Sequence, residues 1–103
     1  MPDNQYLRDA SGRLCFEMFL VPACSYDAVT QDIAAKFELV FHNSLVSSIL
    51  GYAFQDYRSG EHVVGLEWDN WTGFSVVAKT PESEVLLREI GSWLLESPWA
   101  NLQ

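Results

Sequence analysis

Residues 61–78 alternate between apolar and polar positions with a period of two, which is the pattern of β-strands that bury one face. Turn signals at Ser59-Gly60 and at residues 70–73 separate three runs rich in aromatic and β-branched residues. We therefore predict three consecutive antiparallel strands after residue 51. Placing Trp68 opposite Phe74 gathers six residues on the face expected to be buried, with Glu67 and Asp69 on the other. The six are Val64, Leu66, Trp68, Phe74, Val76 and Ala78.

The chain before this meander contains a strand and a helix. Residues 14–21 are apolar apart from Glu17 and predict a first strand, which Pro22 ends. Ser25 is the expected N-cap of a helix over residues 26–37, where apolar positions recur at helical spacing.

The C-terminal helix has the clearest start signal in the chain. Thr80 supplies a capping hydroxyl, Pro81 occupies the first helical position, and Glu82 and Glu84 lie in the first turn, where the helix dipole favours negative charge. Apolar residues then recur on one helical stripe, and we expect the helix to end before Pro98.

Residues 37–50 fit three alternatives: a continuation of the helix, a short strand at residues 39–41, or a loop with one further turn. The order of elements is then strand, helix, three-stranded antiparallel meander, helix. We predict an α+β fold with both helices packed on one face of the sheet. Residues 1–103 are expected to form a single domain, with a flexible segment at residues 1–12 and a C-terminal tail at residues 98–103.

Fourteen acidic residues against six Lys and Arg give the chain a net charge of −8. Nucleic acids and anionic membranes bind clustered basic residues, so we expect neither as a partner and favour a basic protein instead. The alternative is that the acidity only maintains solubility. The chain shows neither a membrane-spanning apolar stretch nor a secretory signal at its start, and we expect a cytoplasmic protein.

The residues that could carry chemistry do not form a recognisable catalytic or metal-binding motif. Cys15 and Cys24 are expected to be reduced core residues, because free cysteine packs as a small hydrophobic residue. Their spacing, and that of His42 and His62, does not match a zinc site, so no metal or cofactor is expected. We expect no enzymatic activity; the alternative is a ligand-binding or catalytic domain with its site between sheet and helices.

Two tryptophans and two acids surround the tip of the second hairpin. If Trp68 faces the core, Trp71 lies in the loop, where it either meets a partner or caps the core beside Trp93. Carboxylates on the sheet face opposite Leu66 are expected to add an acidic patch. The partner-binding residues that we predict are Asp56, Glu61, Glu67, Asp69 and Trp71.

The stretch from Glu61 to Leu95, a Trp-Asp hairpin followed by a Leu-rich helix, resembles small acidic immunity proteins of bacterial polymorphic toxin systems. The resemblance implies an α+β domain that binds a cognate toxin and occludes its active cleft or an adjacent surface. It assigns no role to individual residues. A homodimer that buries the aromatic hairpin against a second copy is the remaining alternative.

Overall fold

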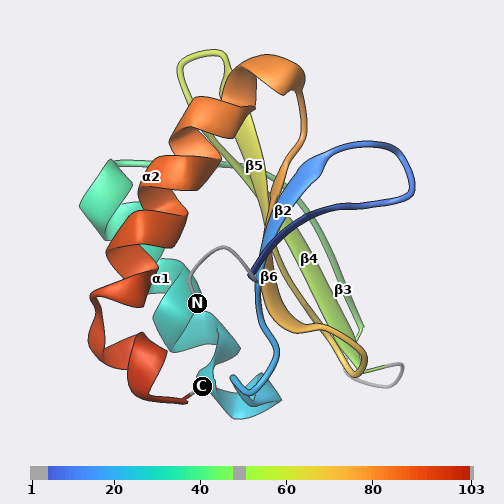
Figure 1. Ribbon diagram of the computed structural model, residues 1–103, viewed down its shortest axis with the longest axis vertical. Helices are drawn as coiled ribbons and strands as arrows, with labels where there is room; N and C mark the ends of the chain where they lie inside the picture. Colours follow the sequence, from blue (N-terminus) through green and yellow to red (C-terminus); the bar gives the residue numbers. More distant parts are fainter. Residues whose placement is uncertain (1–4, 48–50, 103) are drawn as a thin grey trace.

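The computed structural model describes residues 5–47 and 51–102. Six strands form one antiparallel sheet in the order β1-β2-β6-β5-β4-β3, and both helices lie on the same side of it (Figure 1). The predicted α+β class is confirmed. The elements are β1 (Tyr6–Arg8), β2 (Leu14–Met18), α1 (Tyr26–Phe37), β3 (Val40–Ser47), β4 (Tyr52–Ser59), β5 (His62–Asp69), β6 (Gly73–Ala78) and α2 (Glu84–Leu95).

The predicted register of β5 and β6 is confirmed, since Trp68 pairs with Phe74, and the two following pairs on the same face also match. The meander nevertheless has four strands, because residues 40–47 form β3 along the outer side of β4. A bulge between Phe41 and Asn43 shifts the alternation by one residue. That shift hides the period of two in the sequence and explains why the segment was left open.

The N-terminal segment that was expected to be flexible contains β1, which forms a hairpin with β2. Tyr6 of β1 packs on Phe16 with ring centroids 5.0 Å apart, so burial of these rings holds the strand in place. In the segment expected to be a C-terminal tail, Pro98–Leu102 form a 3-10 helix, and the Trp99 indole donates a hydrogen bond to Asp32 of α1 at 2.9 Å.

Both helices begin near the predicted residues, but neither uses the predicted hydroxyl as a cap. Ser25 occupies the N-cap of α1 without a side-chain hydrogen bond. A 3-10 helix at Pro81–Ser83 precedes α2, and the Thr80 and Ser83 hydroxyls lie 2.7 Å apart. Ser83 Oγ also accepts the backbone N–H of Val63 at 2.7 Å. These hydroxyls therefore attach the start of α2 to β5.

The core fills the space between the sheet and the two helices. Two polar groups fix this packing: the Tyr26 hydroxyl of α1 donates to the carbonyl of Leu66, and the Trp68 indole donates to the carbonyl of Val21 at 2.9 Å. The largest fully buried side chains include Phe16, Met18, Ile33, Leu66, Phe74, Leu87, Ile90 and Leu94.

No helix in residues 5–47 and 51–102 has the length and apolar character needed to cross a membrane.

Candidate functional site

The sheet has an outer face, by which we mean the face turned away from α1 and α2. Residues that alternate with the core positions lie on this face, because successive side chains in a strand point to opposite sides. On β5 these are Glu67 and Asp69, and the register places Asp56 of β4 and Ser75 of β6 on the same face. The strand alternation thus brings most of the predicted acidic residues to one side of the sheet.

One lysine forms ion pairs with two of the predicted carboxylates. Lys79 Nζ lies 2.9 Å from Glu67 Oε2 and 3.6 Å from Asp56 Oδ1. The three side chains are only 18–25% exposed and lie over Gly65, where an added Cβ would come within 2.6 Å of both Glu67 and Lys79. Glu67 and Asp56 therefore belong to a compact ion cluster that covers the middle of the sheet, rather than to an exposed acidic patch.

Glu61 lies at the opposite end of the sheet from Trp71. It precedes β5, whereas Trp71 follows it, and at about 3.3 Å per residue the strand between them spans roughly 26 Å. Glu61 instead borders a surface depression with His62 and Glu82. Glu61 therefore lies in the turn before β5 and far from Asp69 and Trp71, which follow or end that strand.

Trp71 projects from a turn that a carboxylate holds in shape. Asp69 Oδ1 accepts the backbone N–H groups of Trp71 and Thr72, each at 2.8 Å, and the Thr72 hydroxyl at 3.1 Å. The Trp71 side chain is 91% exposed, so of the two alternatives it lies in solvent and does not cap the core. Trp93 packs edge-on against Phe37 instead, with ring centroids 6.0 Å apart.

A second exposed apolar segment lies beside this turn. Phe19 and Leu20 are 66% and 52% exposed, and the Phe19 backbone packs so closely on Gly73 that a Cβ there would meet it at 2.5 Å. The strand predicted over residues 14–21 ends at Met18, and the exposure of the residues after it was not predicted. The signal was present, because residues 18–21 are four consecutive apolar residues and a strand can bury only every second one on a single face.

Glu17 and Asp69 form an uncompensated acidic pair on the outer face. Glu17 pairs with Ser75 and Asp69 with Gly73, so the two carboxylates lie diagonally across β6. Partial burial raises the pKa of Glu17, and the nearby charge of Asp69 raises it further. Within residues 5–47 and 51–102 neither carboxylate has a Lys, Arg or His partner at ion-pair distance. Glu17 was recognisable in the sequence as the one acid inside an apolar strand.

Tyr52 and Phe54 complete this region, because their rings stack on the outer face of β4 with centroids 5.0 Å apart. Aromatic faces and carboxylates attract the same kind of group, a Lys or Arg side chain, through cation–π contacts and ion pairs respectively. We call this region the aromatic–acidic surface; it consists of Glu17, Phe19, Leu20, Tyr52, Phe54, Asp69 and Trp71.

Replacing Glu17 with glutamine is expected to stabilise the fold at pH 7. Because the folded-state pKa of Glu17 is raised, ionisation of its carboxylate disfavours folding above the ordinary pKa of 4.5, and this penalty disappears below it. The gain in unfolding free energy should therefore shrink as the pH falls from 7 to about 4, measured by urea denaturation.

The control for this prediction is Glu89→Gln, which removes the same charge from an exposed position on α2. It reports the relief of general repulsion in a chain of net charge −8. The prediction is contradicted if both variants gain the same unfolding free energy at pH 7, or if the gain of Glu17→Gln does not change with pH. Either result would mean that the environment of Glu17 does not disfavour its ionised form.

Both cysteines are free, but they differ in environment. Cys15 is buried, whereas Cys24 is exposed, so the expectation of two core cysteines is wrong for Cys24. The apolar segment that contains Cys24 does not continue the strand but turns at residues 19–25 towards α1. Burial raises the pKa of the Cys15 thiol to about 11, which keeps it protonated at neutral pH and makes it a poor nucleophile.

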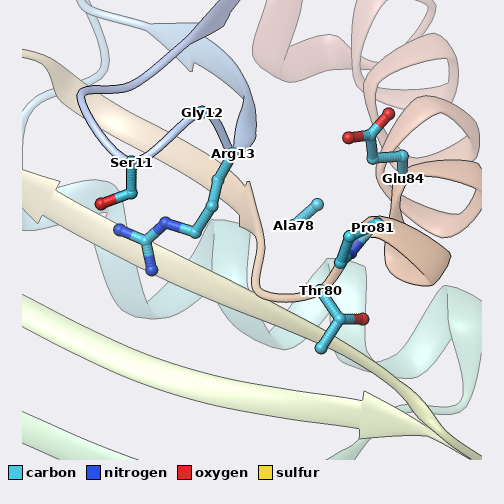
Figure 2. A pocket seen from close by; sticks show the side chains of 7 residues that line it. All are labelled: Ser11, Gly12, Arg13, Ala78, Thr80, Pro81 and Glu84. Atoms are coloured by element: carbon cyan, nitrogen blue, oxygen red, sulfur yellow. The ribbon is translucent and has the colours of Figure 1, made fainter.

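A small pocket lies where the β1–β2 turn meets the start of α2 (Figure 2). Its volume of about 150 Å³ is below the range of typical small-molecule sites. Its two charged residues already have partners: Arg13 binds Asp9 at 2.9 Å, and Glu84 binds Arg8 at 2.8 Å. In the described part of the chain, His, Cys, Asp and Glu side chains form no group of three that would suit a metal ion.

Comparisons with protein-family models, with characterised proteins and with solved structures give no match to this chain. The function is therefore inferred from the aromatic–acidic surface itself.

Proposed function

We propose that this chain is a non-enzymatic protein-binding domain of the immunity type, which acts in the cytoplasm and neutralises a basic toxin domain by covering part of its surface. The observation that carries the proposal is the exposed indole of Trp71 on a turn held by Asp69. Tryptophan is the residue type most enriched among the hot spots of protein interfaces.

The turn favours binding because its shape exists before any partner arrives. Three hydrogen bonds to one carboxylate oxygen of Asp69 fix the loop, so little backbone entropy remains to be lost on association. Phe19 and Leu20 lie on the adjoining segment and extend the apolar contact area. A partner that covers these side chains removes apolar surface from water, which is the main favourable contribution in most protein associations.

The chemistry of the partner follows from charge. Burial raises the pKa of Glu17 most, and the nearby negative charge of Asp69 raises it further, so the two carboxylates repel each other. A Lys or Arg of the partner placed between them relieves this repulsion, and the net charge of −8 attracts a basic protein over longer distances. In the ion cluster, Lys79 offsets one of the two negative charges of Asp56 and Glu67, so the cluster contributes less to this attraction than two unpaired carboxylates would.

We expect an immobilised wild-type chain to retain a basic protein from a lysate of the source cells, and Trp71→Ala to lose it. In binding kinetics with the purified partner, Trp71→Ala should raise the off-rate and cost about 2 kcal/mol or more. Glu17→Gln should mainly lower the on-rate and weaken its dependence on salt, because it removes long-range attraction. Co-expression should then protect cells from the captured protein if that protein is a toxin.

The matched control is Val85→Ala, which shortens an exposed apolar side chain on α2, on the opposite side of the sheet. It should retain the partner as the wild type does. The proposal is wrong if Trp71→Ala and Val85→Ala, both folded by circular dichroism, retain the same proteins, or if the retained protein is acidic. If the chain captures a basic protein but does not change its activity, the chain is a protein-binding domain and the proposed immunity function is wrong.

A further inference from the structure

The two edges of the sheet differ in length and in chemistry. One edge is β1, which has three residues and includes Arg8. The other is β3, which has eight residues and, in the described part of the chain, pairs with β4 alone. A long unpaired edge presents a row of free backbone N–H and C=O groups, which are competent to pair with a further strand.

The β3 edge lacks most of the features that discourage such pairing. Charged residues and proline normally protect an edge, yet none of the residues of Val40–Ser47 is Asp, Glu, Lys, Arg or Pro. This is unusual in a chain in which 19% of the residues are charged. Its one protective feature is the bulge between Phe41 and Asn43, beyond which the regular ladder runs from Asn43 to Ser47. Val40 and Phe41 expose apolar side chains at the start of the strand.

We infer that β3 is a self-association edge, through which two copies of this chain form a continuous antiparallel sheet across a two-fold axis. The occupant is a second copy, because an uncharged edge fits another uncharged edge and β3 is the long uncharged edge that the chain itself supplies. Each copy carries a net charge of −8, so two copies repel each other at most relative orientations. Pairing of β3 with β3 places no Asp, Glu, Lys or Arg of one copy opposite another across the new ladder.

The symmetry also fits. Antiparallel pairing of a strand with its own copy is an isologous contact, which closes after two subunits and leaves no further edge of the same kind. Full pairing of the regular ladder places Leu45 on the two-fold axis, opposite Leu45 of the second copy. Only the short β1 strands, with Arg8, then remain at the two ends of the twelve-stranded sheet. The Trp71 turn joins β5 and β6, which β4 separates from β3, so the new ladder does not include it, although its Asn70 lies beside Gly51 at the start of β4.

The first test is the mass of the purified chain in solution. Analytical ultracentrifugation should show a dimer of twice 11.7 kDa, whose share rises with protein concentration and exceeds that of the monomer before about 1 mM is reached. The dimer should become tighter as the salt concentration rises from about 0.05 M to about 0.5 M, because screening weakens the repulsion between two acidic chains. A chain that is monomeric at about 1 mM in both salts overturns the inference.

The second test locates the contact in the wild-type protein by hydrogen exchange. Amides of residues 43–47 should be protected more at high protein concentration than at low concentration, whereas amides of β1 should show no such change. Concentration-dependent protection at the Trp71 turn instead of at β3 would also overturn the inference, because the dimer would then form through the aromatic–acidic surface.

Two neighbouring proline variants, Ser44→Pro and Leu45→Pro, test the ladder directly. Successive residues of an edge strand direct their N–H groups alternately towards β4 and away from it, so one variant breaks the β3–β4 pairing and the other removes only an outward donor. The variant that remains folded should dimerise at least about tenfold more weakly than the wild type. A folded variant that dimerises as the wild type does contradicts the inference, and if neither folds, the hydrogen-exchange result decides.

Salt separates this inference from the proposed function. Binding to a basic partner weakens with salt, whereas self-association of an acidic chain strengthens. Trp71→Ala should leave the dimer intact, and the proline variant that remains folded should leave binding of a basic partner intact. Either proposal can therefore fail without affecting the other.

Discussion

Replacement of Leu66 by alanine is expected to lower the free energy of unfolding by about 2–5 kcal/mol. Leu66 lies in the middle of β5, between Gln55 of β4 and Val76 of β6, and its side chain is fully buried. Truncation leaves a cavity between sheet and helices that neighbouring strands on both sides prevent from collapsing. The backbone carbonyl still accepts the Tyr26 hydroxyl, so the loss reports side-chain packing alone.

Urea denaturation of the two proteins measures this loss, and Val85→Ala serves as the control on an exposed apolar residue. The control should stay within about 0.5 kcal/mol of the wild type, as is usual for surface positions. A loss at Leu66 that is no larger than that of the control would show that β5 does not turn this face to the core.

Replacement of Gly73 by alanine should be the most damaging change at the candidate site, with a loss of about 2–4 kcal/mol. Gly73 has φ of +68°, a conformation that residues with a Cβ adopt at a cost. Its Cβ would also lie 2.5 Å from the Cα and the carbonyl oxygen of Phe19. Because backbone atoms cannot move aside as a flexible side chain does, the strand and the Phe19 segment must separate.

Gly60→Ala isolates the first of these two costs, the conformational one. Gly60 has φ of +61°, close to that of Gly73, but an added Cβ meets no atom within 4 Å. It should therefore lose only the conformational part, about 1–2 kcal/mol. Equal losses in the two variants would mean that the contact between Gly73 and Phe19 is not close. In a binding assay, Gly73→Ala should also weaken binding of the partner, since it displaces the Phe19 segment from the Trp71 turn.

The sequence was a good guide wherever a local pattern carried the information. The register of Trp68 opposite Phe74 was predictable because, with the turn at residues 70–73, this alignment places three cross-strand pairs of apolar residues on one face. The start of α1 was predictable for the same kind of reason, since apolar residues recur at helical spacing after Ser25, whereas its end at Phe37 was one of three alternatives.

The prediction was wrong or incomplete where a residue's role depends on segments distant in sequence. β1 was assigned to a flexible segment because three residues carry no periodic signal, and only packing of Tyr6 on Phe16 makes them a strand. β3 was left open because its bulge breaks the alternation. The predicted acidic patch is not continuous, because Lys79, twelve residues after Glu67, forms an ion pair with the Glu67 carboxylate.

The sequence by itself determined the α+β class, the faces of the meander strands, the net charge of −8 and the position of Trp71 in a turn. These properties follow from composition and from periodicity over a few residues, which the backbone geometry of strands and helices translates directly into faces. Tertiary structure alone decided that Trp71 lies in solvent, that Glu17 and Asp69 have no cationic partner among residues 5–47 and 51–102, and that Glu61 is remote from Trp71. Burial and ion pairing depend on distances between strands, and alternation specifies the side of the sheet but not the position along it.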